Sequence, residues 1–467
     1  MMIAAMAWST VCTAGPPEAA HKHPGASRSR EPMTDKRPTL EQPKSQYQPL
    51  PRVDTLLTGA TLLDGVGGRA DDVDVLMRNG VIVAVGRHLQ RDGVSVIDAR
   101  GRWVTPGIID IHTHYGTYLL PQTAAESTVS DVLENSDPNV ADTWIENAVR
   151  PTDPAFSRAL AGGVTTLQIL PGSSALFGGR SVIVKPVPAV TVDQMRFPDA
   201  PQGLKMACGA NPADSFGGRG RFPNSRQGEI AGVRAAFIEA QHYQDEWDEY
   251  LQGHEHKPPH RNLKMDTLVR VLKGEMPVHL HCYRADDIST WMATLAEFGV
   301  HIAAVHHATE GYKIAGRLAQ GQVCAAVWPD WWGFKREAED GIPENAAFID
   351  AAGGCAILHS DIPLLGSLLN IEAAKAAAAG RRAGLSIPPE RAIRWITSNP
   401  AHALSLDSKI GRIAEGMNAD IVLWSGDPFS VYSAADLVFI DGAIAFDRHH
   451  ARTSDFELGR PQKQANP

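Results

Sequence analysis

Two histidines one residue apart, His112 and His114, are the residues of this sequence that most clearly suit a chemical role. They follow the apolar run GIID, which is typical of a buried strand. Side chains at positions i and i+2 of a strand share a face, so both imidazoles are expected to point the same way where the strand ends. Imidazole nitrogens are common ligands of transition metals, so the pair indicates a metal site. Two surface histidines after a strand are the alternative interpretation of this pair alone.

Residue types that bind metals also end three later apolar runs. His281 ends PVHLH, His307 ends IAAVHH, and Asp361 ends CAILHSD. In a barrel of alternating strands and helices, the carboxyl ends of the strands meet at one rim, where active sites are built. Together with the first pair, these endings are difficult to explain by core packing, and they favour a metal centre.

The elements that would position these side chains alternate along residues 106–405. Alternating strands and helices predict a parallel sheet with helices on its faces, and this length favours a closed (β/α)8 barrel. The stretch EIAGVRAAFIEAQHYQDEWDEYL has the apolar spacing of an amphipathic helix, and Asp286-Asp287 is predicted to cap the helix ISTWMATLAEFG. The strand-like runs are GIIDIHTH, VTTLQILPG, GLKMACGAN, PVHLHCY, HIAAVHHA, QVCAAVWP and GCAILHSD.

Short alternating runs lie on both sides of this region, at residues 51–105 and 406–450. Asn79-Gly80 between two such runs is a hairpin turn signal. The later segment repeats the pattern in ADIVLW and DLVFIDGAIAF. The two segments are therefore predicted to form the two parts of one small β-domain that flanks the barrel.

These motifs together resemble the amidohydrolase superfamily, and within it the imidazolonepropionase-like and prolidase-like branch. The resemblance runs from about residue 53 to 448 and is carried by PGIIDIHTH, the strand-ending histidines and aspartate, and SNPAHALSL with GRIAEGMNADIVLW. It implies a barrel with a small composite β-sandwich domain. Carried over by position, it implies that His112, His114, His281 and His307 are metal ligands. Asp361 would be both a ligand and the catalytic general acid/base.

The resemblance is specific for the superfamily and leaves the substrate open. A divalent ion, with Zn2+ favoured and manganese or iron as alternatives, would activate a water, and Asp361 would carry its proton to a leaving nitrogen. We therefore expect a metal-dependent amidohydrolase that cleaves an amide, cyclic amide or peptide-like C–N bond. A deaminase of a heterocyclic amine and a binding protein with a decayed metal site are the alternatives.

Three further histidines lie within two residues of the predicted ligands. His279 shares a strand face with His281, so spacing alone leaves either as the ligand, and the resemblance favours His281. His306 and His359 lie one and two positions before a predicted functional residue. They are predicted to pack near the site rather than to bind the ion.

Residues of the loops after the predicted strands are candidates for substrate binding. Tyr283 and Arg284 follow one strand, and Trp331 and Trp332 lie in the loop WPDWWGFKREAEDG after another. An arginine suits a carboxylate of the substrate because its guanidinium binds in a bidentate manner. Pairing of Arg284 with the acidic residues that follow it, and packing of the aromatic residues, are equally acceptable alternatives.

The number of metal ions depends on Ala210. In relatives that resemble this chain, GLKMACG continues with Glu-Asn-Pro, whereas this sequence has Ala210, whose methyl group binds no metal. Lys205, five residues earlier, is expected to point to the opposite face, and Lys185 is left open as a modified ligand. Without a bridging anion, one ion per chain is favoured.

Composition supports a chain with a large core and a small-molecule substrate. Of the 467 residues 43% are hydrophobic and the net charge is −9, which argues against a nucleic-acid partner. No apolar run reaches the ~18–20 residues of a membrane span. Assembly into a homo-oligomer is left open. The number of cysteines is odd, there is no CxxC pair, and four of the cysteines lie in apolar, strand-like runs, which predicts small buried core residues. The cysteines are Cys12, Cys208, Cys282, Cys324 and Cys355.

The two ends of the sequence are predicted to lie outside the fold. Residues 1–50 combine a signal-like stretch, MMIAAMAW, with a polar, proline-containing linker, and a basic segment before the stretch is missing. An exported or periplasmic location is expected from this stretch, with a cytoplasmic one as the alternative. Residues 451–467 are predicted to be a C-terminal tail.

Overall fold

The computed structural model describes residues 41–450, so the signal-like stretch, Cys12 and the predicted tail 451–467 lie outside the described residues. The two predicted β segments do join in one sheet of eight strands. Its order is β17-β16-β15-β5-β1-β2-β3, with β4 paired to β1. The strands are β1 Thr55–Leu63, β2 Arg69–Arg78, β3 Val81–Gly86, β4 Ser95–Asp98, β5 Trp103–Pro106, β15 Ile421–Trp424, β16 Ala435–Ile440 and β17 Ala443–Asp447.

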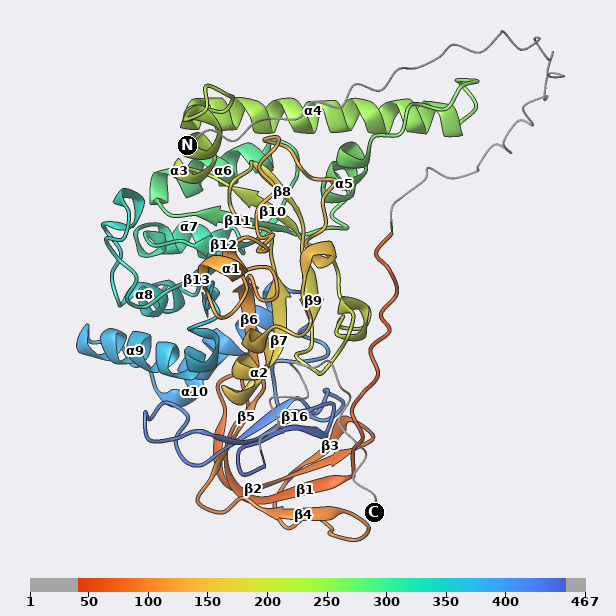
Figure 1. Ribbon diagram of the computed structural model, residues 1–467. Coiled ribbons are helices and arrows are strands. Elements are labelled where there is room, and N and C mark those ends of the chain that lie inside the picture. Colours follow the sequence, from red (N-terminus) through yellow and green to blue (C-terminus); the bar gives the residue numbers. More distant parts are fainter. Residues whose placement is uncertain (1–40, 451–467) are drawn as a thin grey trace, which may run out of the picture. The chain divides into compact units, whose positions relative to one another are not determined.

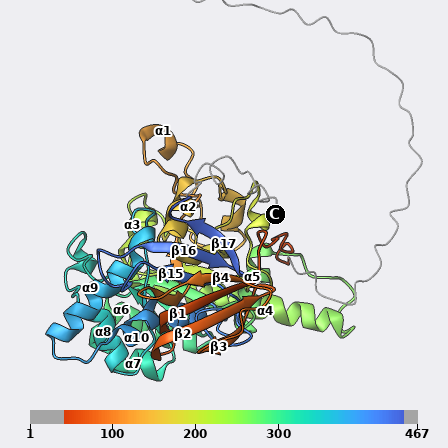
Figure 2. The same ribbon diagram turned by 90° about the horizontal axis from the view of Figure 1, so that it is seen from below.

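The join between the two segments is the antiparallel pairing of β15 with β5, which also pairs in parallel with β1. Figure 2 shows β1 to β4 beside β15, β16 and β17. Hydrogen bonds link all eight strands into a single sheet. The resemblance implies a β-sandwich of two packed sheets instead. The predicted hairpin turn is confirmed, because Asn79 and Gly80 both have positive φ between the antiparallel β2 and β3. That backbone conformation is the one that a two-residue hairpin turn requires.

All seven strand-like runs of the middle region form strands. Five of them pair in parallel in chain order, from β10 to β14, and β6 pairs in parallel with β7. Two strands were not predicted: β8 pairs antiparallel with β10, and β9 pairs antiparallel with β7. The strands are β6 Ile108–Thr113, β7 Val164–Ile169, β8 Phe177–Arg180, β9 Val182–Val184, β10 Leu204–Ala207, β11 Val278–Cys282, β12 Ile302–His307, β13 Cys324–Val327 and β14 Ala356–Leu358.

Hydrogen bonding divides these strands into a six-stranded sheet, β14-β13-β12-β11-β10-β8, and a three-stranded sheet, β6-β7-β9. Helices separate consecutive parallel strands, and Figure 1 shows α6, α7, α8 and α9 following one another along the side of β11, β12 and β13. The helices are α1 Ala124–Ser127, α2 Pro154–Ala161, α3 Ala210–Gly217, α4 Arg226–Leu251, α5 Leu263–Leu272, α6 Ala285–Ala296, α7 Ala315–Gln320, α8 Asn345–Ala351, α9 Leu369–Arg382, α10 Pro389–Ala392 and α11 Ser398–Ala403.

Two helix predictions have different outcomes. The amphipathic helix is α4, and its spaced residues Val233, Phe237 and Trp247 are buried as the pattern indicates. The capping prediction is wrong, because α6 begins at Ala285 and Asp286 therefore lies inside its first turn. The Asp286 carboxylate accepts hydrogen bonds from Arg284 instead.

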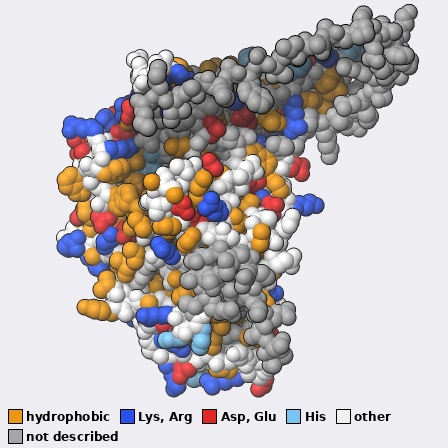
Figure 3. Space-filling view, viewed as in Figure 1, with side chains coloured by type: hydrophobic (Ala, Val, Ile, Leu, Met, Phe, Trp, Pro, Cys, Tyr) orange, Lys and Arg blue, Asp and Glu red, His pale blue; other side chains and the backbone are white. Residues whose placement is uncertain are grey.

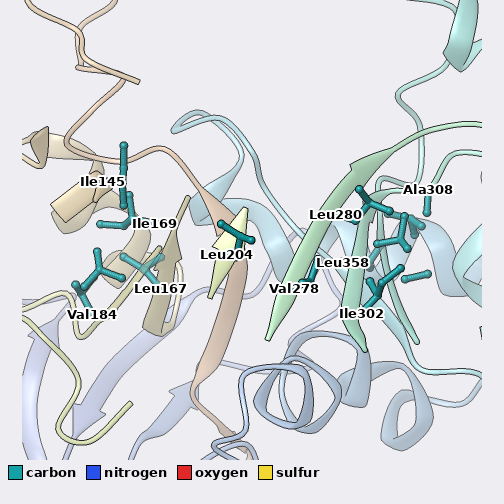
Figure 4. Packing of buried hydrophobic residues seen from close by; sticks show 14 of the residues in the cluster. Ile145, Leu167, Ile169, Val184, Leu204, Val278, Leu280, Ile302, Ala308 and Leu358 are labelled. Atoms are coloured by element: carbon teal, nitrogen blue, oxygen red, sulfur yellow. The ribbon is translucent and has the colours of Figure 1, made fainter. Parts of the chain in front are cut away.

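The parallel strands divide their side chains between two faces. On β10 and β11, Leu204, Met206, Val278 and Leu280 belong to the large apolar core, and Figure 4 shows three of them, Leu204, Val278 and Leu280. The alternate positions of these strands carry polar residues, among them His279 on β11. We call the side of the strands on which His279 lies the inner face. Side chains alternate strictly between the two faces of a strand. Packing of the apolar side chains on the opposite face therefore determines which side chains point to the inner face.

Four of the five cysteines form disulfides, which the prediction of small buried core residues did not include. Cys208 is bonded to Cys282, and Cys324 to Cys355. Neighbouring parallel strands bring these pairs together, which residue spacing along the chain does not reveal. Three of the four are buried, as expected, and Cys355 is partly buried.

The surface of the described residues carries mixed side chains. Figure 3 shows charged and apolar side chains interspersed on the face it presents. Among residues 41–450, no helix combines the length and the apolar character needed to cross a membrane.

Candidate metal centre

The residues predicted from strand endings come together at one place. His112 lies near the end of β6, His281 on β11, and His307 at the end of β12. Asp361 follows β14, and its backbone N–H donates to the carbonyl oxygen of His112 over 2.9 Å. His281 and His306 are register partners of the parallel β11 and β12, so these strands end at the same level.

The first histidine pair shares one carboxylate oxygen. Oδ1 of Asp361 lies 3.2 Å from Nε2 of His112 and 3.3 Å from Nε2 of His114. The other nitrogen of His114, Nδ1, is 2.8 Å from the carbonyl oxygen of Leu170 and must donate to it. In the neutral ring, Nε2 of His114 then has a lone pair that faces the carboxylate. A cation or a proton between these atoms removes the repulsion, so the arrangement fits a metal ion.

The remaining imidazoles complete the cluster. The ring centres of His281 and His307 are 4.4 Å apart, and that of His307 lies 4.8 Å from His112. The potential ligand atoms form two overlapping groups, each within 4.8 Å: His112 with His307 and His359, and His112 with His114 and Asp361.

Several buried nitrogens in this cluster lack a partner. Both ring nitrogens of His281 and of His359, and Nδ1 of His307, have no hydrogen-bond partner within the described residues. A buried polar atom without a partner costs about 1–3 kcal/mol. Unpartnered nitrogens on converging rings are what a metal ion would satisfy, so the donor set fits a divalent cation.

Burial keeps the imidazoles neutral, the form that binds metals. Desolvation lowers the pKa of His112, His281 and His307 well below the ordinary value, and lowers that of His359 to about 3. Burial alone would raise the pKa of Asp361. The interaction with His114, which requires a proton between its Nε2 and the carboxylate, and the nearby Lys205 outweigh burial, so the pKa of Asp361 is lowered.

Two of the candidate ligands have an unusual backbone. His307 has φ 74° and Asp361 has φ 64°, in the left-handed region that few residues other than glycine adopt. Such conformations cost of the order of 1–3 kcal/mol each and cluster at functional sites. His307 ends β12 and Asp361 lies three residues after the end of β14, so both residues lie where a strand turns into a loop.

His359 has a more central place than predicted. It is part of a potential ligand group, whereas the sequence interpretation placed it beside the site. The signal was present, because one residue separates His359 from Asp361, as one residue separates His112 from His114. His306 is hydrogen-bonded to His112 through one ring nitrogen and to His279 through the other.

The interpretation of Lys205 is wrong. Its side chain is fully buried on the inner face, as the register partner of His279. The prediction counted five residues of extended strand back from Ala210, but β10 ends at Ala207 and Ala210 begins helix α3. Burial lowers the pKa of Lys205 to about 7, and its Nζ donates to the carbonyl oxygen of Pro171 over 3.0 Å.

Lys185 lies elsewhere. Its Nζ forms salt bridges with Asp420 at 3.2 Å and Asp441 at 2.8 Å. Both carboxylates belong to the C-terminal part of the chain around β15 and β16, and Lys185 directly follows strand β9. The salt bridges therefore connect β9 to that C-terminal part.

Aromatic rings line the approach to His307. Tyr283 stacks on His307 with an interplanar angle of 12°, and Trp328 stacks on it at 25° with ring centres 4.4 Å apart. Trp331 stacks in turn on Trp328. Nζ of Lys335 lies 3.7 Å from the centre of the Tyr283 ring. Trp328 was not among the predicted substrate-binding residues.

The other two predicted substrate residues point elsewhere. The Trp332 side chain is 65% exposed, and Arg284 pairs with Asp286 at 2.8 Å. At Ala210, the backbone N–H donates to Glu337 over 2.8 Å, so another segment places a carboxylate beside this position.

Comparisons with known proteins show the family to which this chain is similar. Residues 264–445 match the model of the amidohydrolase family. The crystal structure of an amidohydrolase from Thermotoga maritima is 32% identical, with a TM-score of 0.77, and the match covers 84% of this chain and 100% of that one.

Two curated relatives extend the likeness. Amidohydrolase tasK of Hapsidospora irregularis is 32% identical over 80% of this chain, but the chain spans only 40% of the length of that protein. An imidazolonepropionase of Mesorhizobium japonicum is 25% identical, and the match covers 84% of this chain and 94% of that protein.

Proposed function

The chain belongs to the amidohydrolase family, and on that premise we propose that it is a metal-dependent hydrolase of an amide, cyclic amide or peptide-like C–N bond. The observation that carries the proposal is a pair of potential ligand groups that share His112: one with His307 and His359, whose buried nitrogens lack partners, and one with His114 and Asp361. A protein that kept this set only for packing would bear the cost of every unpartnered nitrogen.

The proposed architecture is a closed barrel of the (β/α)8 type, with residues 51–105 and 406–450 as its satellite domain. The antiparallel β8 and β9 are consecutive and pair with β10 and β7, which supports closure between these two strands. The hydrogen bond from Asp361 to His112 supports closure between β14 and β6. In this architecture the inner face is the barrel interior.

His112, His114, His281 and His307 are the proposed ligands, together with Asp361. We add His359 to the candidates because its buried nitrogens lack partners and one of them belongs to the ligand group of His112 and His307. One ion would take its ligands from part of these candidates and keep one position open for water. Zn2+ is the proposed ion, since imidazole and carboxylate ligands suit it, and a bound divalent ion supplies a water that ionises near neutral pH.

The residues of the chain then have separate tasks. Asp361, whose lowered pKa leaves it unprotonated, accepts the proton of the water and returns it to the leaving nitrogen. The hydrogen bond to Leu170 fixes the tautomer of His114 and leaves its Nε2 free for the ion. Trp328, Tyr283 and His307 form a stacked wall that excludes water from one side of the reacting bond.

The test of the proposed function is a substrate screen with the purified protein and added zinc or manganese. We expect the protein to hydrolyse at least one of three substrate classes: N-acyl amino acids, dipeptides and cyclic ureides. Ammonia release from a heterocyclic amine, with no amide hydrolysed, would support the deaminase alternative. Absence of turnover together with absence of metal binding would favour a binding protein.

We propose one ion per chain and expect elemental analysis of the purified protein to give close to one equivalent of zinc, manganese or iron. Two divalent ions 4 Å apart repel each other by roughly 16 kcal/mol at an effective dielectric constant of 20, so a second ion needs a bridging anion. Ala210 supplies none, and Lys205 as a free amine brings no negative charge.

Ala210→Glu tests the number of ions per chain, because it supplies the missing carboxylate. This variant is expected to raise the metal content or the rate. Two tightly held ions per chain in the wild-type protein would contradict the proposal. Chemical modification of Lys205 would then be the first feature to examine, because its amine is buried on the inner face.

The aromatic wall is the proposed substrate surface, and it predicts different effects for two adjacent tryptophans. Trp331→Ala is expected to raise KM about 2- to 10-fold for substrates with an apolar group, since an aromatic contact contributes about 0.5–1.5 kcal/mol. Trp332→Ala is the control, because this side chain is largely exposed. Equal effects of the two changes on KM would contradict this placement of the pocket.

An exported location remains our proposal for the protein. The two disulfides between β10 and β11 and between β13 and the start of β14 support it, because such bonds persist in oxidising compartments.

A further inference from the structure

Three buried histidines form a continuous hydrogen-bonded chain along the inner face. Nδ1 of His112 lies 2.9 Å from Nδ1 of His306, and Nε2 of His306 lies 3.0 Å from Nδ1 of His279. All three side chains have no exposed surface. The far nitrogen, Nε2 of His279, has no hydrogen-bond partner within residues 41–450. The chain starts at the metal centre, since Nε2 of His112 faces Asp361.

We propose that His306 and His279 are positioning residues for His112, and that the three imidazoles form a relay whose tautomers change together when an ion occupies the site. This inference rests on the proposed metal site. Each ring in the relay is neutral, with one N–H and one lone pair, so each hydrogen bond dictates the direction of the next.

An ion at Nε2 of His112 sets the relay in one direction. With an ion bound, His112 would hold it through Nε2, so the proton of His112 would be on Nδ1 and would be donated to Nδ1 of His306. The proton of His306 is then on Nε2 and is donated to Nδ1 of His279, whose own proton is on Nε2. A ligand imidazole held by such a donor–acceptor contact has a fixed ring orientation and is more basic toward the metal.

Without an ion, the relay takes the opposite direction. Nε2–H of His112 donates to Oδ1 of Asp361, 3.2 Å away, so Nδ1 of His112 accepts from Nδ1–H of His306. His279 then donates through Nδ1. On ion binding Nε2 of His112 would lose one proton to solvent and Nε2 of His279 would gain one, while the protons between them move along the two hydrogen bonds. Because His279 has no exposed surface, the proton that it gains must come from solvent during a transient opening of the surrounding structure. The net charge of the relay is unchanged.

At the far end of the relay, the ring of His279 packs directly against the backbone of Gly203. An ideal Cβ on this residue would lie 2.6 Å from Cδ2 and 3.0 Å from Nε2 of His279. The imidazole of His279 therefore occupies the space that any larger residue at position 203 would need. A Gly203→Ala change would displace this ring without adding or removing a polar group.

The direct test is nitrogen NMR of the wild-type protein labelled at histidine with 15N, recorded without metal and with zinc. His279→Gln identifies the signals of His279. We expect His279 to change from the Nδ1–H to the Nε2–H tautomer on zinc binding, although it is not a ligand. Zinc binding without this change would overturn the relay and leave the proposed function intact. Failure of the wild-type protein to bind zinc would overturn both.

Variants of His306 separate positioning from space filling. His306→Gln keeps an acceptor and a donor, and it is expected to hold zinc within a few-fold of wild-type affinity. His306→Leu fills the space but breaks the relay, and is expected to weaken zinc binding about 10- to 100-fold, the range seen when partners of ligands are removed. His301→Gln, an exposed residue just before β12, is the control. A residue that only filled space would tolerate leucine better than glutamine, so that order would overturn the inference.

Discussion

Asp361→Asn is expected to lower kcat by about 10²- to 10⁴-fold while the protein remains folded and retains most of its metal. A proton transfer by a positioned acid or base contributes this range in rate. The amide of asparagine has nearly the shape of the carboxylate, but it cannot accept the proton of the water at neutral pH. The imidazoles that surround the ion are unchanged, so metal content is expected to stay close to that of the wild type.

The measurement combines kcat on a hydrolysed substrate with the metal content of the same preparation. Asp286→Asn is the matched control, because its carboxylate is largely exposed and pairs with Arg284. A near wild-type rate for the Asp361 variant would assign another role to this residue. Loss of the metal together with the rate would show that Asp361 acts chiefly as a ligand.

Strand positions in the middle of the chain could be predicted because buried parallel strands are apolar runs with a recognisable length. The exceptions are β8 and β9, Phe177–Arg180 and Val182–Val184. FGGR is short and rich in glycine, so it lacks the apolar run by which the other strands were recognised. The disulfides were missed for a related reason: the pairing of Cys208 with Cys282 depends on which strands are neighbours, and cysteine spacing carries no information about that.

The candidate site could be predicted where a strand ended in a ligand and where the period-two rule applied within one strand. The same rule failed for Lys205, because the strand does not continue to Ala210 and the residue count crossed a strand end. The central place of Trp328 and the contact of Glu337 with Ala210 depend on the fold of the loop after β13. Such contacts are long-range in sequence, and no local pattern indicates them.

His112→Ala combined with His114→Ala is expected to abolish metal retention. Removing hydrogen-bond partners of ligands lowers metal affinity about 10- to 100-fold, so the loss of two ligands is expected to exceed about 100-fold. Nε2 of both residues lies within 3.3 Å of the same oxygen of Asp361, and His112 belongs to both potential ligand groups. The remaining histidines therefore cannot rebuild either group as it stands.

Metal content after dialysis, measured by elemental analysis, and zinc affinity by calorimetry decide this prediction. His449→Ala with His450→Ala is the control, because it also removes two adjacent histidines, both exposed and distant in sequence from the centre. The control is expected to keep the wild-type metal content and the double variant to lose it. If the double variant keeps its ion, we would conclude that His281, His307 and His359 bind it instead. A wild-type protein that neither holds nor responds to zinc, manganese or iron would remove the metal centre altogether, and with it the role of Asp361.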